Sequence, residues 1–109
     1  MATTIALQRN EAMIMLRKEV KPYGTQKQVE GFYLPGDHVL LVEDVMTTGS
    51  SILESVRLLE EQGLVVEDIL VFLDREEGGT AQLRNLGYTV HTVFTLIDVL
   101  AYAPQTTHQ

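Results

Sequence analysis

The sequence predicts a single α/β domain, residues 1–109, built on a mainly parallel β-sheet. Apolar runs of strand length alternate with stretches of helical period, which is typical of parallel strands joined by right-handed helical crossovers. The apolar run within residues 38–43 is continuous rather than alternating, as in a strand that is covered on both faces. A chain of 109 residues is enough for one domain of this class.

Five strands are predicted from apolar runs, each flanked by turn residues or charged residues. The first run ends in Arg17 and Lys18, and the second returns just before the turn at residues 35–36. Residues 38–43 hold a continuous apolar run and are expected as a buried strand, residues 66–73 as a second buried strand, and residues 88–93 as a third strand. The predicted strands are residues 13–16, 29–34, 38–43, 66–73 and 88–93.

Three helices are predicted from apolar residues at helical spacing. In the first, Ile52, Val56 and Leu59 recur on one face, and Gly63 follows as the C-terminal stop. Gly87 ends the second helix in the same way. The predicted helices are residues 50–62, 80–86 and 95–102, and residues 104–109 are expected to fray.

The charges are distributed unevenly. The net charge is −7, which argues against nucleic acid or an anionic membrane as a general partner. Residues 18–28 are polar and follow neither period, so we expect a mobile, exposed loop there. A concentrated basic loop on an acidic body suits the local capture of a polyanion. Four of the 8 basic residues lie at this loop: Arg17, Lys18, Lys21 and Lys27.

Several functional classes are excluded or disfavoured. The chain has no cysteines, which excludes disulfides and thiolate metal sites. The histidines lack metal-ligand spacing, and His91 is expected to pack within its strand. No secretory signal or transmembrane run is evident. We therefore expect a cytoplasmic enzyme or binding domain.

The chemistry of the chain is concentrated just after the strand at residues 38–43. Glu43 and Asp44 open into a loop of Thr, Gly and Ser that leads straight into the first predicted helix. Hydroxyls and unpaired backbone N–H groups at a helix N-terminus form a site for phosphate. The two carboxylates would repel phosphate but suit the hydroxyls of a sugar. A ribose 5-phosphate fits this layout.

Better-known phosphate motifs do not fit this loop. No Lys follows Gly49, as a P-loop requires, and one Gly does not make a dinucleotide fingerprint. The plain alternative is a strand–loop–helix junction in which Ser50 caps the helix and both carboxylates are merely solvated. The complete loop with its acidic pair favours the sugar-phosphate site.

The expected topology places this loop beside two other polar segments. Ligands of open α/β sheets bind beyond the carboxyl ends of the strands. Arg17, residues 43–51 and residues 74–77 each follow a predicted strand. We therefore expect them to lie together at one edge of the sheet.

Three ordered segments resemble motifs of one family. The phosphoribosyl diphosphate (PRPP) motif of type I phosphoribosyltransferases resembles residues 42–51, V-E-D-V-M-T-T-G-S-S. The mobile-loop signature R-K-E-x-K-x-[HY]-G of orotate phosphoribosyltransferase is similar to residues 17–24, R-K-E-V-K-P-Y-G, and its later turn to residues 73–79, L-D-R-E-E-G-G. The Tyr at position 23 resembles the form found in bifunctional UMP synthases.

The resemblance implies that PRPP and orotate give orotidine 5′-monophosphate and diphosphate. It implies that Lys21 and Asp44 are catalytic, that Arg17 and Lys18 help Lys21 to neutralise the diphosphate, and that Glu43 and Asp44 hold the ribose hydroxyls. The implied PRPP contacts are Arg17, Lys18, Lys21, Glu43, Asp44, Val45, Met46, Thr47, Thr48, Gly49, Ser50 and Ser51.

The resemblance also implies an orotate site, a cofactor and a partner. Thr47 and Arg75 match the orotate contacts, since a guanidinium can pair with a carboxylate in a bidentate manner. Arg75 could instead pair with the adjacent Glu76 and Glu77. Mg²⁺ is implied as a cofactor, bound mainly through the diphosphate of PRPP and not by protein metal ligands. In the family the mobile loop reaches a neighbour's site, so a homodimer is implied.

Family members are longer, and what precedes the R-K-E strand is reduced here to residues 3–9. The absent part includes the diphosphate-binding loop and the strand leading to it, which in the family lies between the strands at residues 13–16 and 38–43. We therefore expect a truncated form of the family's three-layer core, with one short antiparallel edge strand. Its sheet should have either a gap there or direct pairing of those two strands.

Two other functions stay open beside the enzyme. The truncation favours a non-catalytic PRPP sensor or an inactive fragment. The basic loop favours the enzyme, because a sensor has no chemistry to shield from water. A phosphoribosyltransferase for purine bases is disfavoured by residues 17–25.

Overall fold

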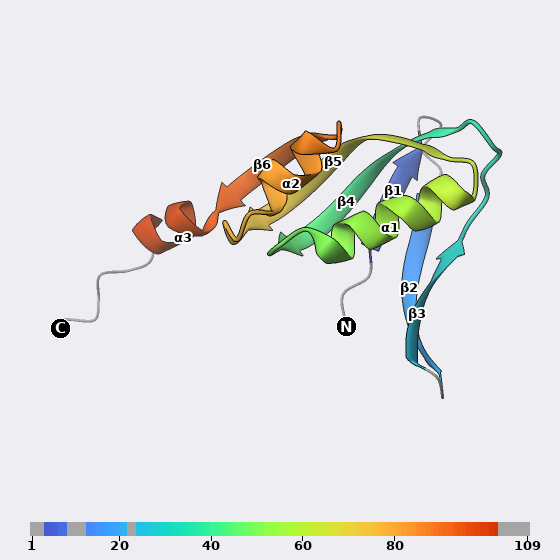
Figure 1. Cartoon of the computed structure of the whole chain (residues 1–109), viewed down its shortest axis with the longest axis horizontal. Coiled ribbons are helices and arrows are strands. Elements are labelled where there is room, and N and C mark those ends of the chain that lie inside the picture. Colours follow the sequence, from blue (N-terminus) through green and yellow to red (C-terminus); the bar gives the residue numbers. More distant parts are fainter. Residues whose placement is uncertain (1–3, 9–12, 22–23, 103–109) are drawn as a thin grey trace.

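A six-stranded mixed sheet forms the centre of the structure (Figure 1), in the order β3-β2-β1-β4-β5-β6. The computed structural model describes residues 4–8, 13–21 and 24–102, with the backbone alone for residues 13, 17–21 and 24–28. The strands are β1 Thr4–Gln8, β2 Met13–Lys21, β3 Gly24–Glu30, β4 His38–Met46, β5 Val65–Asp74 and β6 Thr89–Thr95. The helices are α1 Ser50–Glu61, α2 Gly79–Asn85 and α3 Leu96–Tyr102.

The parallel half of the sheet agrees with the prediction from sequence. β4 pairs with β5 and β5 with β6, each in parallel register, and α1 and α2 form the crossovers. These elements begin and end close to the predicted residues, because their signals are local: the apolar runs of β4 and β5, the amphipathic pattern of α1, and the glycines that follow the helices. The predicted α/β class is confirmed.

Both crossover helices cover the same face of the sheet, as Figure 1 shows. The two crossovers, from β4 to β5 and from β5 to β6, move in the same direction across the sheet. Because both are right-handed, their helices must lie on the same face. Val56 and Leu59 of α1 and Leu83 of α2 are fully buried against this face, as are Leu41 and Ile69 of the strands. The described residues therefore form two layers, in keeping with the expected truncated form of the three-layer core.

The opposite face of the sheet, termed the open face, carries apolar side chains with no described helix over them. Leu7 of β1, Phe72 of β5 and Val93 of β6 are 42%, 48% and 45% exposed. Their strand neighbours Ala6 and Val71 are fully buried on the other face. None of the described helices is long and apolar enough to span a membrane.

β1 lies in the interior of the sheet and runs antiparallel to both of its neighbours. Thr4 pairs with Leu16 of β2, and Ile5 pairs with Val42 of β4. The expectation of a gap or of direct β2–β4 pairing is therefore wrong. The physical reason is that β1 satisfies the backbone N–H and C=O groups of both strands, which would otherwise remain unpaired edges.

Residues 18–28 were expected as a loop, but residues 18–21 and 24–28 lie in the paired strands β2 and β3, which project from the sheet in Figure 1. Arg17 of β2 lies opposite Gln28 of β3, and Lys21 lies opposite Gly24. The polar sequence hid these strands because cross-strand backbone pairing, and not an apolar face, holds them together. β3 is the expected antiparallel edge strand, although it covers residues 24–30 instead of 29–34.

Candidate functional site

The carboxyl ends of β4 and β5 lie side by side, as the sequence predicted. Met46 is in register with Asp74, and the Arg75 N–H donates a hydrogen bond to the Met46 carbonyl at 2.9 Å. The loops that follow the two strands therefore form one polar surface. We term residues 43–51 and 74–79 the loop rim.

Helix α1 begins where the loop after β4 ends. Gly49 is the N-cap with φ 87°, a left-handed conformation that glycine adopts without steric cost. Glycine offers no side chain to cap the helix, and the first turn carries no acidic residue. Ser50, the cap in the plain alternative, is instead the first residue of α1. The positive end of the helix dipole and its backbone N–H groups are thus suited to an anion.

Hydroxyl groups surround the start of this helix. Thr47, Thr48 and Ser50 are exposed, and the Thr48 Oγ1 and Ser50 Oγ atoms lie 3.1 Å apart. Ser51 follows in α1 and is also exposed. A phosphate at the helix start can therefore accept hydrogen bonds from hydroxyls and backbone N–H groups together.

Val45 and Met46, also predicted to contact PRPP, make contacts within the protein. The Val45 N–H donates to Asp44 Oδ1 at 2.8 Å, and the Met46 side chain is buried in the core. These contacts hold the backbone where β4 leaves the sheet.

The acidic pair is divided between two environments. Asp44 is exposed at the loop rim, whereas Glu43 is only 6% exposed. The Thr4 hydroxyl donates to the Glu43 carboxylate and lies 2.9 Å from Oε1 and 3.0 Å from Oε2. The sequence did not single out Thr4, because no local pattern predicts that β1 lies next to β4.

Asp74 is a buried carboxylate that shapes the loop after β5. It accepts hydrogen bonds from the Glu76 N–H at 2.8 Å and from the Thr80 hydroxyl at 2.7 Å. The first of these bonds accompanies a left-handed Glu76, with φ 60°. Asp74 is 6% exposed and acts on the loop conformation. An Asp whose side chain bonds the backbone two residues on is a known turn pattern, which could have indicated this role.

The two loops touch through glycine backbones. The Gly79 N–H donates to the Thr47 carbonyl at 3.2 Å. A Cβ added to Gly79 would lie 2.7 Å from Met46 Sδ and 2.8 Å from the Thr47 carbonyl oxygen. The place of the loop after β4 therefore depends on the absence of a side chain at Gly79, a residue that the sequence analysis did not single out.

The basic residues predicted for the site lie on two elements. Arg75 is exposed at the loop rim, and its Nε lies 3.7 Å from Glu77 Oε2. Such a surface pair is weak, so the guanidinium can turn to an anionic ligand. Arg17, Lys18 and Lys21 lie in β2, and the roles predicted for their side chains fall outside the described part of the chain.

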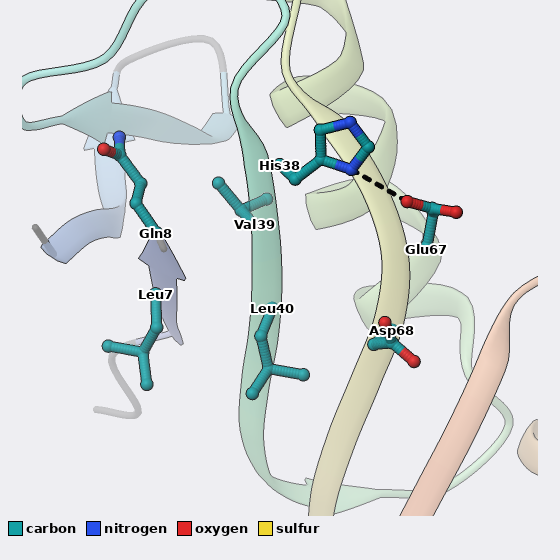
Figure 2. A pocket seen from close by; sticks show the side chains of 7 residues that line it. All are labelled: Leu7, Gln8, His38, Val39, Leu40, Glu67 and Asp68. Atoms are coloured by element: carbon teal, nitrogen blue, oxygen red, sulfur yellow. Dashed lines mark hydrogen bonds and ion pairs between the residues drawn. The ribbon is translucent and has the colours of Figure 1, made fainter. Parts of the chain in front are cut away.

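A shallow cavity of about 300 Å³ lies at the amino ends of β4 and β5, away from the loop rim (Figure 2). Within it, His38 Nδ1 lies 2.8 Å from Glu67 Oε1. His91 is exposed and pairs with Asp68 at 3.2 Å, so the expectation that it is a packing residue of its strand is wrong. The described residues contain no group of three His, Cys, Asp or Glu that could hold a metal. The cavity is lined by Leu7, Gln8, His38, Val39, Leu40, Glu67 and Asp68.

The fold and the loop rim together define the class of the protein. A parallel α/β unit carries an acidic pair, a Thr-Gly-Ser loop and an uncapped helix start in that order. Residues 10–93 match the phosphoribosyl transferase domain family, and the chain belongs to that family.

Within this family the chain is similar to orotate phosphoribosyltransferases and UMP synthases. It is 44% identical over 90 residues to uridine 5′-monophosphate synthase of Caenorhabditis elegans, across 83% of this chain and 18% of that protein. The structure of orotate phosphoribosyltransferase from Aeropyrum pernix has a TM-score of 0.68 at 40% identity, covering 80% of this chain and 49% of that one.

A further relative was solved with PRPP bound. Orotate phosphoribosyltransferase of Mycobacterium tuberculosis H37Rv, in complex with PRPP, has a TM-score of 0.61 at 32% identity over 65% of this chain and 44% of that one. The chain thus spans about half the length of the two solved enzymes and 18% of the C. elegans protein.

Proposed function

We propose that this chain binds PRPP at the loop rim and acts as an orotate phosphoribosyltransferase of pyrimidine nucleotide biosynthesis. The observation that carries the proposal is the uncapped start of α1 beneath exposed hydroxyls, with the Asp44 carboxylate exposed beside it. The reaction transfers the phosphoribosyl group of PRPP to orotate and releases diphosphate. The proposal includes a cytoplasmic location.

The 5-phosphate of PRPP would bind at the start of α1. Backbone N–H groups of the loop and of the first turn would donate to its oxygens, together with the hydroxyls of Thr47, Thr48 and Ser50. Gly49 holds the loop in this position, because it adopts a left-handed φ and a side chain there would meet the Gly79 backbone.

The ribose would lie against the acidic pair. Displacement at the anomeric carbon passes through a cation-like transition state, and negative charge grows on the leaving diphosphate. Asp44 would hold a ribose hydroxyl and favour positive charge on the sugar, and Glu43 would hold the other hydroxyl. Catalysis would then come mostly from positioning and electrostatic stabilisation.

The diphosphate would be neutralised from the β2–β3 hairpin by Arg17, Lys18 and Lys21. Leu16 pairs with Thr4, and at about 3.3 Å per residue Lys21 lies about 16 Å further along β2. The β2–β3 pair at Lys21 and Gly24 therefore extends well past the level of Thr4. This reach supports a homodimer in which Lys21 enters the neighbouring site. Mg²⁺ would bind chiefly to the diphosphate oxygens, its preferred hard ligands, and offset their charge.

Orotate would lie beside Thr47 and Arg75. Both side chains are exposed at the loop rim, and their loops are joined by the bond from the Arg75 N–H to the Met46 carbonyl. A guanidinium can bind the orotate carboxylate through two parallel hydrogen bonds. The pair with Glu77 would have to open for this to happen.

PRPP binding without transfer is the second candidate, and the direction of β1 favours it. The interior position between β2 and β4 is occupied by a strand that starts at the rim, where the resemblance would place a strand that ends in a diphosphate-binding loop. The described residues offer no such loop there.

The test combines turnover with binding. The pure chain is mixed with PRPP, Mg²⁺ and orotate while the orotate absorbance is followed, and PRPP binding is measured by calorimetry. Turnover supports the transferase. Saturable PRPP binding without turnover leaves the binding function, and absence of both overturns the proposal.

A further inference from the structure

We propose that Thr4 is a positioning residue that orients the Glu43 carboxylate for recognition of the ribose hydroxyls. The inference rests on the proposed function of the loop rim. It assigns a role in the site to β1, a strand that lies outside the sequence motifs of the family.

The sheet topology brings Thr4 to the site. β1 runs antiparallel to β4 with Ile5 opposite Val42, so Thr4 lies at the level of Glu43 on the neighbouring strand. Thr4 and Glu43 are each 6% exposed. Because β1 begins at the loop rim, its first residue, Thr4, lies there. A strand parallel to β4 would instead have its last residue at the rim.

The hydrogen bond from Thr4 can fix the orientation of the Glu43 carboxylate. The Thr4 Oγ1 lies almost equally far from the two carboxylate oxygens, at 2.9 Å and 3.0 Å. A hydroxyl shared in this way resists rotation of the carboxylate, and a bond to a charged acceptor away from water is stronger than at the surface.

The experiment compares two ligands and four proteins. Ribose 5-phosphate and inorganic phosphate are titrated by calorimetry into the whole chain and its variants Thr4→Val, Thr4→Ser and Thr4→Ala. Valine matches threonine in shape and lacks the hydroxyl, whereas serine keeps the hydroxyl. Serine and alanine differ by the hydroxyl alone, so they give the same comparison should the valine variant not fold.

Loss of the hydroxyl should weaken ribose 5-phosphate binding about tenfold and leave phosphate binding within about twofold. Thr4→Ser should bind ribose 5-phosphate close to the wild-type affinity. If Thr4 had a structural role alone, its loss would weaken the binding of both ligands alike, and this result would overturn the inference. An unchanged affinity for ribose 5-phosphate would also overturn it. If the wild-type protein binds neither ligand, the proposed function itself fails, which is a different result from an unaffected variant.

Discussion

Gly49 and Gly79 meet backbone to backbone at the loop rim, so that a Cβ on Gly49 would lie 3.1 Å from the Gly79 Cα. The two glycines belong to loops that follow neighbouring parallel strands. Their contact joins the loop proposed to bind phosphate to the loop proposed to bind orotate. The two substrates would then depend on one shared piece of backbone packing.

Gly79→Ala should disturb this packing. Its Cβ would lie 2.8 Å from the Thr47 carbonyl oxygen, a backbone atom that cannot move without shifting the loop. We expect unfolding free energy to fall by about 1–3 kcal/mol, as for overpacked sites, and phosphate binding to weaken. Urea unfolding and phosphate calorimetry measure the two effects.

The matched control is Gly78→Ala. Gly78 has a left-handed φ of 96°, unlike the helical Gly79, and an added Cβ would meet nothing within 4 Å. The conformational cost is about 1–2 kcal/mol, and phosphate affinity should not change. Equal phosphate affinity in both variants would contradict the role given to the Gly79 contact.

Ala6→Asp tests whether β1 occupies the sheet interior. Ala6 is fully buried between Ile14 and Leu41, so an unpaired carboxylate there should cost about 3–5 kcal/mol of unfolding free energy. Leu7→Asp, on the open face of the same strand, should cost about 1 kcal/mol or less because Leu7 is 42% exposed. Similar urea midpoints for the two variants would show that β1 is not inserted as described.

Asp44→Asn tests the sugar site. The substitution removes the charge but keeps an oxygen that can accept the Val45 N–H. We expect PRPP affinity to fall about tenfold and phosphate affinity to stay the same or rise. Glu67→Gln, at the amino end of β5, is the control for the change in net charge. Unchanged PRPP affinity in Asp44→Asn would count against this assignment.

Lys21→Ala tests the hairpin. We expect the variant to lose turnover while it still binds inorganic phosphate, because the start of α1 is unaltered. Lys27→Ala removes a charge from the same hairpin and should retain most of the turnover. A parallel loss of turnover and phosphate binding in Lys21→Ala would refute the role given to the hairpin.

Tyr88→Phe tests a pH effect on stability. Burial raises the pKa of Tyr88 above its usual 10.0, and the hydrogen bond that it donates to Glu60 at 3.0 Å raises this pKa further, while Arg57 opposes the shift. The folded state therefore favours the protonated phenol. This stabilisation is fully present below the unfolded pKa of about 10 and is lost as the pH rises through the higher folded pKa.

The stability advantage of the wild type over Tyr88→Phe should therefore be constant near neutral pH and shrink above about pH 10. Urea unfolding of both proteins across this range measures the difference. An advantage that is independent of pH would contradict the proposed ionisation.

The parallel half could be predicted from the sequence because its signals are local. The apolar runs of β4 and β5, the spacing of Ile52, Val56 and Leu59, and the glycines after the helices each act within a few residues. The convergence at the loop rim followed from the rule on strand ends, and the register of Met46 with Asp74 agrees with it.

Most of the pairing in the antiparallel half could not be predicted, because the partners are distant in sequence or polar. Nothing near Thr4 indicates that Glu43, 39 positions away, is its hydrogen-bond partner. The β2–β3 ladder is made by backbone N–H and C=O groups. Because these groups occur in every sequence, the polar residues of β2 and β3 give no pattern from which the ladder could be predicted. The contact of Gly79 with Met46 and Thr47 depends on interatomic distances, which a pattern of residue types does not contain.

The position of β1 also bears on the order of folding. Its pairing with β2 closes a short connection, whereas its pairing with β4 joins residues as far apart as Ile5 and Val42. Short closures cost less chain entropy and form sooner. The three N-terminal strands should thus assemble as a meander before the parallel half docks. During that interval one side of β1 is available for the same pairing from another chain, so association and correct folding compete for a single strand.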